Sequence, residues 1–505
     1  MDKHFIYKST DAIIKQAAGF QISPVLLKVV APLAILLFAS LGLNFYQQQQ
    51  RSLWKTIKNP DTVSLLRQFV TQEKAQAYTD TNGVPPEFRS MFKSAERGDW
   101  LTFSNKYLTL IEERNYWLSL MCGERRSNDY SGRVEDWISN VTGKIGWRWE
   151  PRSPPGLTGT AGEAVKDMYG ALESLAVGNE EYSTQFGREI FNSIPAGSIY
   201  LGGPGPGRFL VTAMCQSHLH DNQFCIVAQD ELRDEDYRGV LENRYGKEIY
   251  IPTKNDQEQC IKEFRDNIER QMRIGPAGSE HFPYLDINTD LAKIMFEKNP
   301  RREFYLNEEY PMEWMNLHLE PYGLIFKLNR EPAATISDKI VARDHAYWLQ
   351  RIKPMIGGWL TETTTVAQVV AFVEKIHWRQ DLRGFDGDTK FIQNAYWQIM
   401  FSRPRSAIAG LYQWRADHSA DSADKNRMLQ EADFAFRQAW ALSPGSLEIL
   451  CRYVNFLLSQ NNYKAALLVA NTSALLPQNT GDETLTQLLT SLKEWQTNPP
   501  SATHM

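Results

Sequence analysis

The sequence lacks the motifs by which an enzyme is usually identified from its chain alone. It contains no G-x-S-x-G elbow, no P-loop and no H-E-x-x-H pair. Nothing in it therefore points to the chemistry of a serine hydrolase, a nucleotide hydrolase or a zinc protease. We name no catalytic residue on this basis and expect a non-catalytic protein.

The chain also has few cysteines and a small net charge. The five cysteines are scattered and form no C-x-x-C pair, which gives no disulfide framework or zinc ribbon, and we predict no metal site. With 55 basic and 60 acidic residues the net charge is only −5, so the chain has no global basic field that would hold a polyanion. Nucleic acid is therefore not an expected partner.

One long hydrophobic run is present near the start of the chain. Residues 25–45 carry a single charge, Lys28, and at about 1.5 Å per residue they match the ~30 Å hydrocarbon layer of a bilayer. We predict a transmembrane helix over 25–46, preceded by a tail at 1–24, so that the membrane is a partner. A cleaved signal peptide and a buried soluble helix are the alternatives. The expected location is the inner (cytoplasmic) membrane, with a single-pass signal anchor and most of the chain outside the cytoplasm.

Helical spacing dominates the next predicted region, residues 47–179. Apolar residues recur three and four positions apart on both sides of Gly98. This pattern predicts two helices that are joined at Gly98 as an αα-hairpin.

A glycine run between two apolar stretches marks the centre of the chain. Residues 198–201 are typical of a strand, 202–207 of a glycine loop, and 224–228 of a second strand that follows a helix opening at Arg208. Three further strands are predicted at 248–251, 303–306 and 324–328. Because strands and helices alternate, we predict a Rossmann-like α/β domain over 180–332 with a mainly parallel sheet covered on both faces.

Beyond this domain the pattern is helical. We predict a helical connector over 333–400, helical repeats over 401–497 and a disordered tail over 498–505. The residues that recur at an interval of 33 are Ala432, Phe436, Ala439 and Pro444, which return as Ala465, Val469, Thr472 and Pro477. That interval is typical of tetratricopeptide repeats. An ordinary helical bundle is the alternative.

The glycine loop is the best candidate for a ligand site. Gly203, Gly205 and Gly207 follow a predicted strand and precede a predicted helix. Glycines in such loops let an S-adenosylmethionine-like or nucleotide ligand approach the backbone amides. Pro204 and Pro206 remove two of those amides, so a purely structural turn is the alternative interpretation.

Two charged residues complete this candidate site. Arg208 could bind a phosphate or a carboxylate through its guanidinium fork, and its alternative role is a solvated or salt-bridged side chain. Asp230 lies just beyond the second predicted strand, where comparable folds bind ribose hydroxyls. The cofactor itself is unknown.

Several short segments between residues 85 and 414 carry a resemblance. They are PEFR at 86–89, ERGDW at 96–100, SIPAGSIY at 193–200, PGRF at 206–209, YIPT at 250–253, NPRREFY at 299–305 and HLEPYGL at 318–324. Together they resemble a group of uncharacterised, membrane-anchored bacterial proteins of the Verrucomicrobia type. Residues 194–199 are also similar to the start of the soluble module in membrane proteins related to protein O-mannosyltransferases. The first resemblance implies a single anchor, an α/β core and tetratricopeptide-like helices, and it implies no activity. Relatives carry an acidic residue inside the glycine loop where this chain has Gly205.

The observations together predict a membrane-anchored, non-catalytic scaffold whose C-terminal repeats hold a protein partner. The alternative is an enzyme or ligand sensor that binds a nucleotide, a sugar-nucleotide or an S-adenosylmethionine-like ligand at the loop 202–207.

Overall fold

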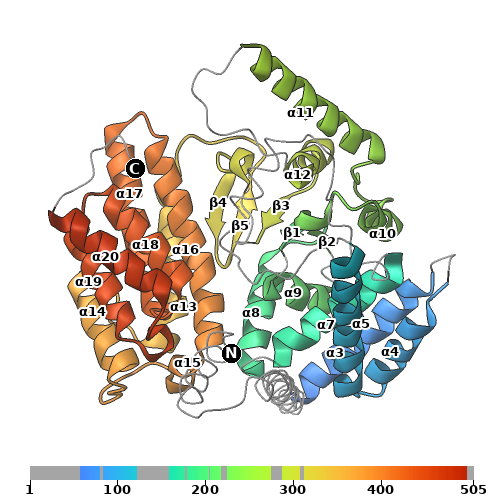
Figure 1. The fold of residues 1–505 in the computed structure, drawn as a ribbon, viewed down its shortest axis with the longest axis horizontal. Helices are drawn as coiled ribbons and strands as arrows, with labels where there is room; N and C mark the ends of the chain where they lie inside the picture. The colour runs from blue at the N-terminus through green and yellow to red at the C-terminus, as the bar shows by residue number, and fades with distance from the viewer. Residues whose placement is uncertain are drawn as a thin grey trace, which may run out of the picture. The chain divides into compact units, whose positions relative to one another are not determined.

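The computed structural model describes most of the chain beyond residue 56 (Figure 1). The described residues are 57, 59–79, 83–121, 159–176, 179–203, 205–217, 224–274, 287–307 and 312–497. The chain separates into two compact units, Met1–Thr56 and Ile57–Met505, and every described residue belongs to the second. The structure is mostly helical (70%) with a small five-stranded sheet.

Local sequence sets the limits of the helices that precede the sheet. These helices are α3 (Pro60–Ala77), α4 (Pro86–Glu96), α5 (Trp100–Met121), α7 (Gly159–Ala176) and α8 (Glu180–Ser193). Asn59 and Asn179 cap α3 and α8, because each side chain accepts a hydrogen bond from an amide of the first turn. Between α4 and α5, Gly98 adopts φ +69°, a conformation that favours glycine. The αα-hairpin predicted around Gly98 is therefore confirmed.

The sheet has the strand order β2-β1-β3-β5-β4. Its strands are β1 (Ile199–Gly202), β2 (Cys225–Ala228), β3 (Phe304–Leu306), β4 (Leu319–Tyr322) and β5 (Ile325–Leu328). β1 runs parallel to β2 and β3, with Ile199 opposite Cys225 and Phe304, whereas β5 runs antiparallel to both β3 and β4. All residues of β1, β2 and β3 are buried, which explains their unbroken apolar runs.

Helices connect the strands and cover them. The connecting elements are α9 (Pro206–Ser217), η1 (Gln229–Glu231), α10 (Glu235–Tyr245), α11 (Lys254–Ile274), α12 (Ile287–Lys298) and η2 (Glu313–Met315). α9 packs against α3, α7 and α8. Its approach to α7 depends on Gly170, because a Cβ at that position would lie 2.4 Å from the Phe209 ring. Sequence-distant helices are thus brought together beneath β1 and β2.

The chain beyond the sheet forms a layer of helices, drawn orange to red in Figure 1. They are α13 (Asp338–Ile356), α14 (Val366–Val373), η3 (Glu374–Trp378), α15 (Thr389–Ile392), α16 (Ala395–Asp417), α17 (Ser422–Leu442), α18 (Leu447–Ser459), α19 (Tyr463–Ala474), η4 (Pro477–Asn479) and α20 (Glu483–Thr497). Arg405 of α16 donates to Asp344 of α13 at 2.6 Å, and both side chains are fully buried. Arg415 donates to the carbonyl of Leu319 at 3.2 Å, which joins α16 to strand β4.

The prediction of a mainly parallel, Rossmann-like sheet is wrong, and helices dominate the structure. Residues 248–251 were expected to form a strand, but the Tyr250 amide donates to the Asn299 side chain at 2.7 Å and makes no ladder hydrogen bond. Their apolar pattern therefore reflects the burial of Ile249 and Ile251 in an irregular segment.

The end of the sheet differs from expectation as well. Residues 319–322, for which no strand was predicted, form strand β4 at the sheet edge. Pro321 is tolerated there because one side of an edge strand needs no ladder partner. Gly323, at φ +68°, turns the chain directly into β5. The sheet is consequently mixed.

The predicted membrane anchorage and location are also corrected. Among the described residues, no helix has both the length and the apolar character needed to span a bilayer. In the described part of the chain this finding contradicts the predicted single-pass fold and the inner-membrane location. The segment 25–46 on which the prediction depended, and the tail 498–505, lie outside the described residues.

The C-terminal helices do not support the tetratricopeptide assignment. α16 and α17 have 23 and 21 residues, whereas α18 and α19 have 13 and 12. Ala432 is fully buried, but its counterpart Ala465 is partly exposed; Pro444 is buried, but its counterpart Pro477 is exposed. The interval of 33 residues therefore relates the hairpin of α16 and α17 to the shorter hairpin of α18 and α19.

Candidate functional site

The glycine loop connects β1 to α9. Because α9 begins at Pro206, Gly207 and Arg208 belong to its first turn, while Gly203 and Gly205 precede it. A Cβ at Gly207 would lie 3.2 Å from the Asn307 side chain at the end of β3. The need for a small residue at Gly207 thus has a packing cause within the protein.

Arg208 is turned into the protein. Its side chain is only 4% exposed, with Nη2 3.7 Å from Asp167 and Nη1 3.5 Å from Glu231. A Cβ at Gly202 would meet the Arg208 Cβ and Cγ atoms at 2.9 Å, so Gly202 gives the arginine stem room to pass beneath β1. The guanidinium that the sequence suggested for a phosphate is therefore paired with carboxylates of the chain itself.

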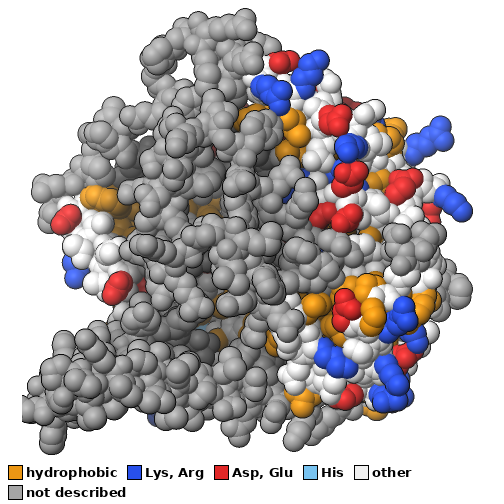
Figure 2. Space-filling model, turned by 45° about the vertical axis from the view of Figure 1, so that its right-hand side comes forward, with side chains coloured by type: hydrophobic (Ala, Val, Ile, Leu, Met, Phe, Trp, Pro, Cys, Tyr) orange, Lys and Arg blue, Asp and Glu red, His pale blue; other side chains and the backbone are white. Residues whose placement is uncertain are grey.

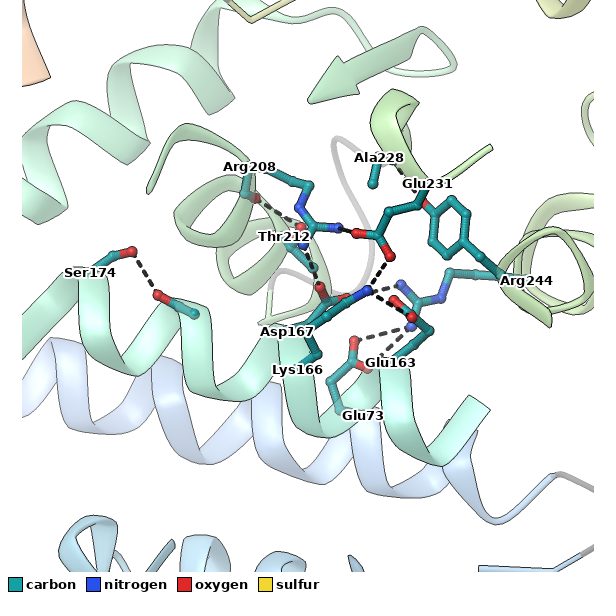
Figure 3. Close-up of polar contacts among 12 residues, drawn as sticks. Glu73, Glu163, Lys166, Asp167, Ser174, Arg208, Thr212, Ala228, Glu231 and Arg244 are labelled. Atoms are coloured by element: carbon teal, nitrogen blue, oxygen red, sulfur yellow. Dashed lines mark hydrogen bonds and ion pairs between the residues drawn. The ribbon is translucent and has the colours of Figure 1, made fainter. Parts of the chain in front are cut away.

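Arg208 belongs to a group of charged side chains that converge from five elements (Figure 3). We call this group the buried charge cluster. Its members are Glu73 of α3, Glu163, Lys166 and Asp167 of α7, Arg208 of α9, Glu231 of η1 and Arg244 of α10. The cluster joins segments that are up to 171 residues apart in the sequence.

Two cations bridge the acidic members of the buried charge cluster. Lys166 Nζ donates to Glu163 at 2.7 Å and also to Glu231. Arg244 donates to Glu73 Oε2 at 3.1 Å and lies 3.9 Å from Asp167. Because charges removed from water must be compensated by partners, this pairing is what allows the group to remain inside the protein.

The buried charge cluster holds more acids than bases. Four carboxylates and three cations would leave one uncompensated negative charge if all were ionised. Burial raises the pKa of Glu163 to about 8, with the charge of Glu231 adding to the effect. Burial likewise raises the pKa of Glu73 to about 7, although Arg244 opposes the shift. Near neutral pH the cluster therefore keeps a proton that an exposed carboxylate would release.

The lysine of the cluster stays charged. Burial alone would lower the pKa of Lys166, but Glu163 and Glu231 raise it above its ordinary value. Lys166 and Glu231 are each 19% exposed and form the outer edge of the cluster. The remaining side chains lie deeper.

The space inside the cluster is too small for an organic ligand. A cavity of about 10 Å³ is lined by Glu163, Asp167, Arg208, Tyr237 and Arg244, among others. A volume of that order holds at most one water molecule. Among the described residues, no group of histidine, cysteine, aspartate and glutamate side chains is arranged to hold a metal ion.

Asp230 lies where the sequence suggested, directly after β2. Its backbone carbonyl accepts a hydrogen bond from Asn288 at 2.9 Å, and its buried Oδ1 atom has no hydrogen-bond partner among the described residues. Burial raises the pKa of this carboxyl, and the neighbouring Glu231 adds to the shift. Asp230 therefore borders the buried charge cluster, and Arg208 faces that cluster instead of an open site.

The sequence analysis missed most of the cluster. Glu163 and Lys166 stand three residues apart in a helix of which 15 residues are buried. Paired charges within so apolar a helix are a signal that could have identified the cluster from the sequence. Glu73 and Arg244 had no such signal, because 171 residues separate them.

Comparisons with protein-family models, with curated proteins and with solved structures found no match. The resemblance to the Verrucomicrobia-type proteins and to O-mannosyltransferase relatives therefore stays a prediction. The assignments to tetratricopeptide repeats and to the Rossmann fold gain no family support.

Proposed function

We propose that the protein is a non-catalytic interaction protein whose C-terminal helices bind a protein partner. The observation that carries this proposal is a pair of exposed leucines. Leu468 of α19 and Leu475 at its C-cap are 39% and 41% exposed. Seven residues separate them, which is two helical turns, so both side chains lie on one face of the helix.

The opposite face of α19 is packed into the protein. Ala466, Val469 and Ala470 are fully buried, so the position of the helix is fixed while the leucine face is presented to solvent. Lys464 and Asn471 are exposed beside the leucines. Apolar side chains surrounded by polar ones on a firmly packed helix are typical of protein-binding surfaces.

The chemistry of this face favours a partner with apolar side chains two helical turns apart, as on an amphipathic helix. On the face of the molecule drawn in Figure 2, Lys and Arg side chains lie interspersed with Asp and Glu over the described elements, so that face has no surface of a single charge. The competing function, a ligand sensor at the loop 202–207, loses support because Arg208 is paired with Asp167 and Glu231.

A double substitution tests the proposal. Proteins retained by the wild-type chain are purified and titrated against wild type, against Leu468→Glu/Leu475→Glu and against Leu317→Glu. Leu317 is 42% exposed but lies outside the helical layer, so it serves as the matched control. We expect the double variant to weaken the dissociation constant at least tenfold, about 1.4 kcal/mol, and the control to leave it within about twofold. Equal weakening by the control, or normal binding by the double variant with an unchanged melting temperature, would contradict the proposal.

A further inference from the structure

A hollow of about 600 Å³ opens at the edge of the sheet where β1 and β3 begin. Its lining includes Gly197 and Ser198 before β1, and Lys298, Arg301 and Arg302 before β3. Since β1 and β3 are parallel, both approach the hollow from their amino-terminal ends. The volume lies within the range of about 300 to 1,000 Å³ that is usual for small-molecule pockets.

The base of the hollow is held together by side chains that cap the backbone. Arg302 donates to the carbonyls of Gly197 and Glu248, each at 2.9 Å. Asn299 both accepts from the Tyr250 amide at 2.7 Å and donates to the Tyr250 carbonyl at 3.0 Å. These contacts join segments 193–200, 250–253 and 299–305, three of those that stood out in the sequence. The hollow is therefore a fixed feature of the fold.

Some of the charged side chains around the hollow form ion pairs, and others do not. Lys298 pairs with Asp256 at 2.8 Å, and Glu303 pairs with Lys327 at 2.7 Å. Those two pairs leave no net charge.

Three arginines at this place have no carboxylate partner among the described residues. Arg302 donates to backbone carbonyls alone, and Arg330 behind it donates to the carbonyls of Phe296, Asn299 and Arg302. Arg301 is exposed and makes no hydrogen bond or ion pair with the described part of the chain. Glu248 also lines the hollow, and its carboxylate forms no ion pair with the described part of the chain. The residues that line the hollow carry three positive charges and two negative ones, an excess of one, in a protein whose net charge is −5.

The position also explains why some of these arginines are present. α8 and α12 both end beside the hollow, and a helix C-terminus carries a partial negative charge that disfavours anions. Arg330 offsets that charge at α12 because it donates to the Phe296 carbonyl in the last turn of the helix. Arg302 donates instead to the carbonyls of Gly197 and Glu248, which lie outside the helices. Arg301 caps no carbonyl, so its guanidinium fork is available to a molecule in the hollow.

We propose that this hollow binds a small molecule through an oxyanion, a phosphate or a carboxylate, that Arg301 contacts. A guanidinium forms two parallel hydrogen bonds with either group, and the local excess of positive charge attracts an anion to the hollow. The site is distinct from the leucine face of α19, and its occupation does not depend on the proposed protein partner.

Titration of the full chain with inorganic phosphate, pyrophosphate and citrate at constant ionic strength tests this site, by calorimetry and by melting temperature. We expect saturable binding of at least one of these probes, and a dissociation constant raised at least tenfold by Arg301→Gln. Arg301→Lys keeps the charge but loses the guanidinium fork. Its dissociation constant should lie between those of the wild type and Arg301→Gln. The control is Arg97→Gln, because Arg97 is an equally exposed arginine on the turn after α4 and the substitution removes the same charge; it should change binding less than about twofold.

The outcomes separate the possible causes. Arg301-dependent binding of phosphate and pyrophosphate alone identifies a phosphate site, and binding of citrate alone identifies a carboxylate site. Absence of saturation below about 10 mM, beyond the millimolar range of weak specific ligands, overturns the proposal. Equal weakening by Arg301→Gln and Arg97→Gln also overturns it, because the effect would then be one of overall charge.

Discussion

Arg208 Nη2 lies 3.7 Å from the Asp167 carboxylate, and both side chains are less than a tenth exposed. This relationship decides between the two interpretations of the glycine loop. An arginine that binds a phosphate needs a guanidinium that is free to pair with it, whereas Arg208 reaches back under β1 and pairs with Asp167 and Glu231. The loop therefore serves to lead the chain from the sheet into α9 while its first charged residue joins the buried charge cluster.

Arg208→Ala should destabilise the protein. Removal of the guanidinium leaves Asp167 and Glu231 short of a partner inside the protein, and loss of one partner from a buried pair costs about 3 to 5 kcal/mol. Urea unfolding measures the change. Arg452→Ala is the control, because Arg452 pairs with Glu448 at 3.0 Å but both are well exposed, and an exposed helical pair contributes only ~0.3 to 0.5 kcal/mol. An Arg208→Ala protein as stable as the wild type would restore the ligand interpretation.

Stability should decrease as the pH rises through the neutral range. Glu163 has a pKa of about 8 in the folded protein and about 4.5 when unfolded, so between these values the folded state binds more protons than the unfolded state. The free energy of unfolding then falls with rising pH, by up to about 1.4 kcal/mol for each pH unit. Glu163→Gln removes one titrating group and should make this dependence less steep between about pH 5 and 8. Part of the slope should remain, because the pKa of Glu73 is also raised, to about 7.

The control for this experiment is Glu87→Gln, which removes an exposed carboxyl of α4. It should leave the slope of stability against pH as in the wild type. A Glu163→Gln protein whose stability falls with pH as steeply as that of the wild type would show that Glu163 is ionised throughout.

Local signals predicted the parts of the fold that depend on neighbouring residues. The predicted strands 198–201 and 224–228 correspond to β1 and β2 because they are apolar apart from Ser198 and are flanked by glycine or polar residues. The hairpin at Gly98 followed from helical spacing and a glycine that can adopt positive φ. In these cases the residues that determine the structure lie within one or two turns of one another.

Prediction failed where residues far away in the sequence determine the local backbone structure or the partner of a side chain. Tyr250 lies in an apolar run typical of a strand, yet Asn299, 49 residues away, takes its backbone hydrogen bonds. Leu319 lies in a segment for which no strand was predicted, yet pairing with Leu328 makes it part of β4. Arg208 follows a glycine loop that suggests a ligand, yet the acids that pair with it come from α7 and η1. Sequence periodicity carries no information about such partners.

The last prediction concerns His345 of α13, which joins two carboxylates. Its Nδ1 lies 2.7 Å from Glu362 and its Nε2 2.5 Å from Glu431 of α17. Both ring nitrogens donate only in the protonated imidazole. Burial alone would lower the pKa of His345 and Arg405 of α16 opposes protonation too, but the hydrogen bond and charge of Glu431, with Glu362, raise the pKa above its ordinary value. The centroid of the Phe434 ring lies 5.1 Å from that of the His345 ring.

Because the folded pKa of His345 is raised, its contribution to stability is complete below about pH 6.5 and is lost as the pH rises through the folded value. His345→Gln should therefore cost about 1 to 2 kcal/mol near pH 6, with a smaller difference from the wild type near pH 9. Urea unfolding at several pH values measures the difference, and the control is His418→Gln at an exposed histidine. A difference that grows as the pH rises would mean that the neutral ring is the form that holds Glu362 and Glu431 together.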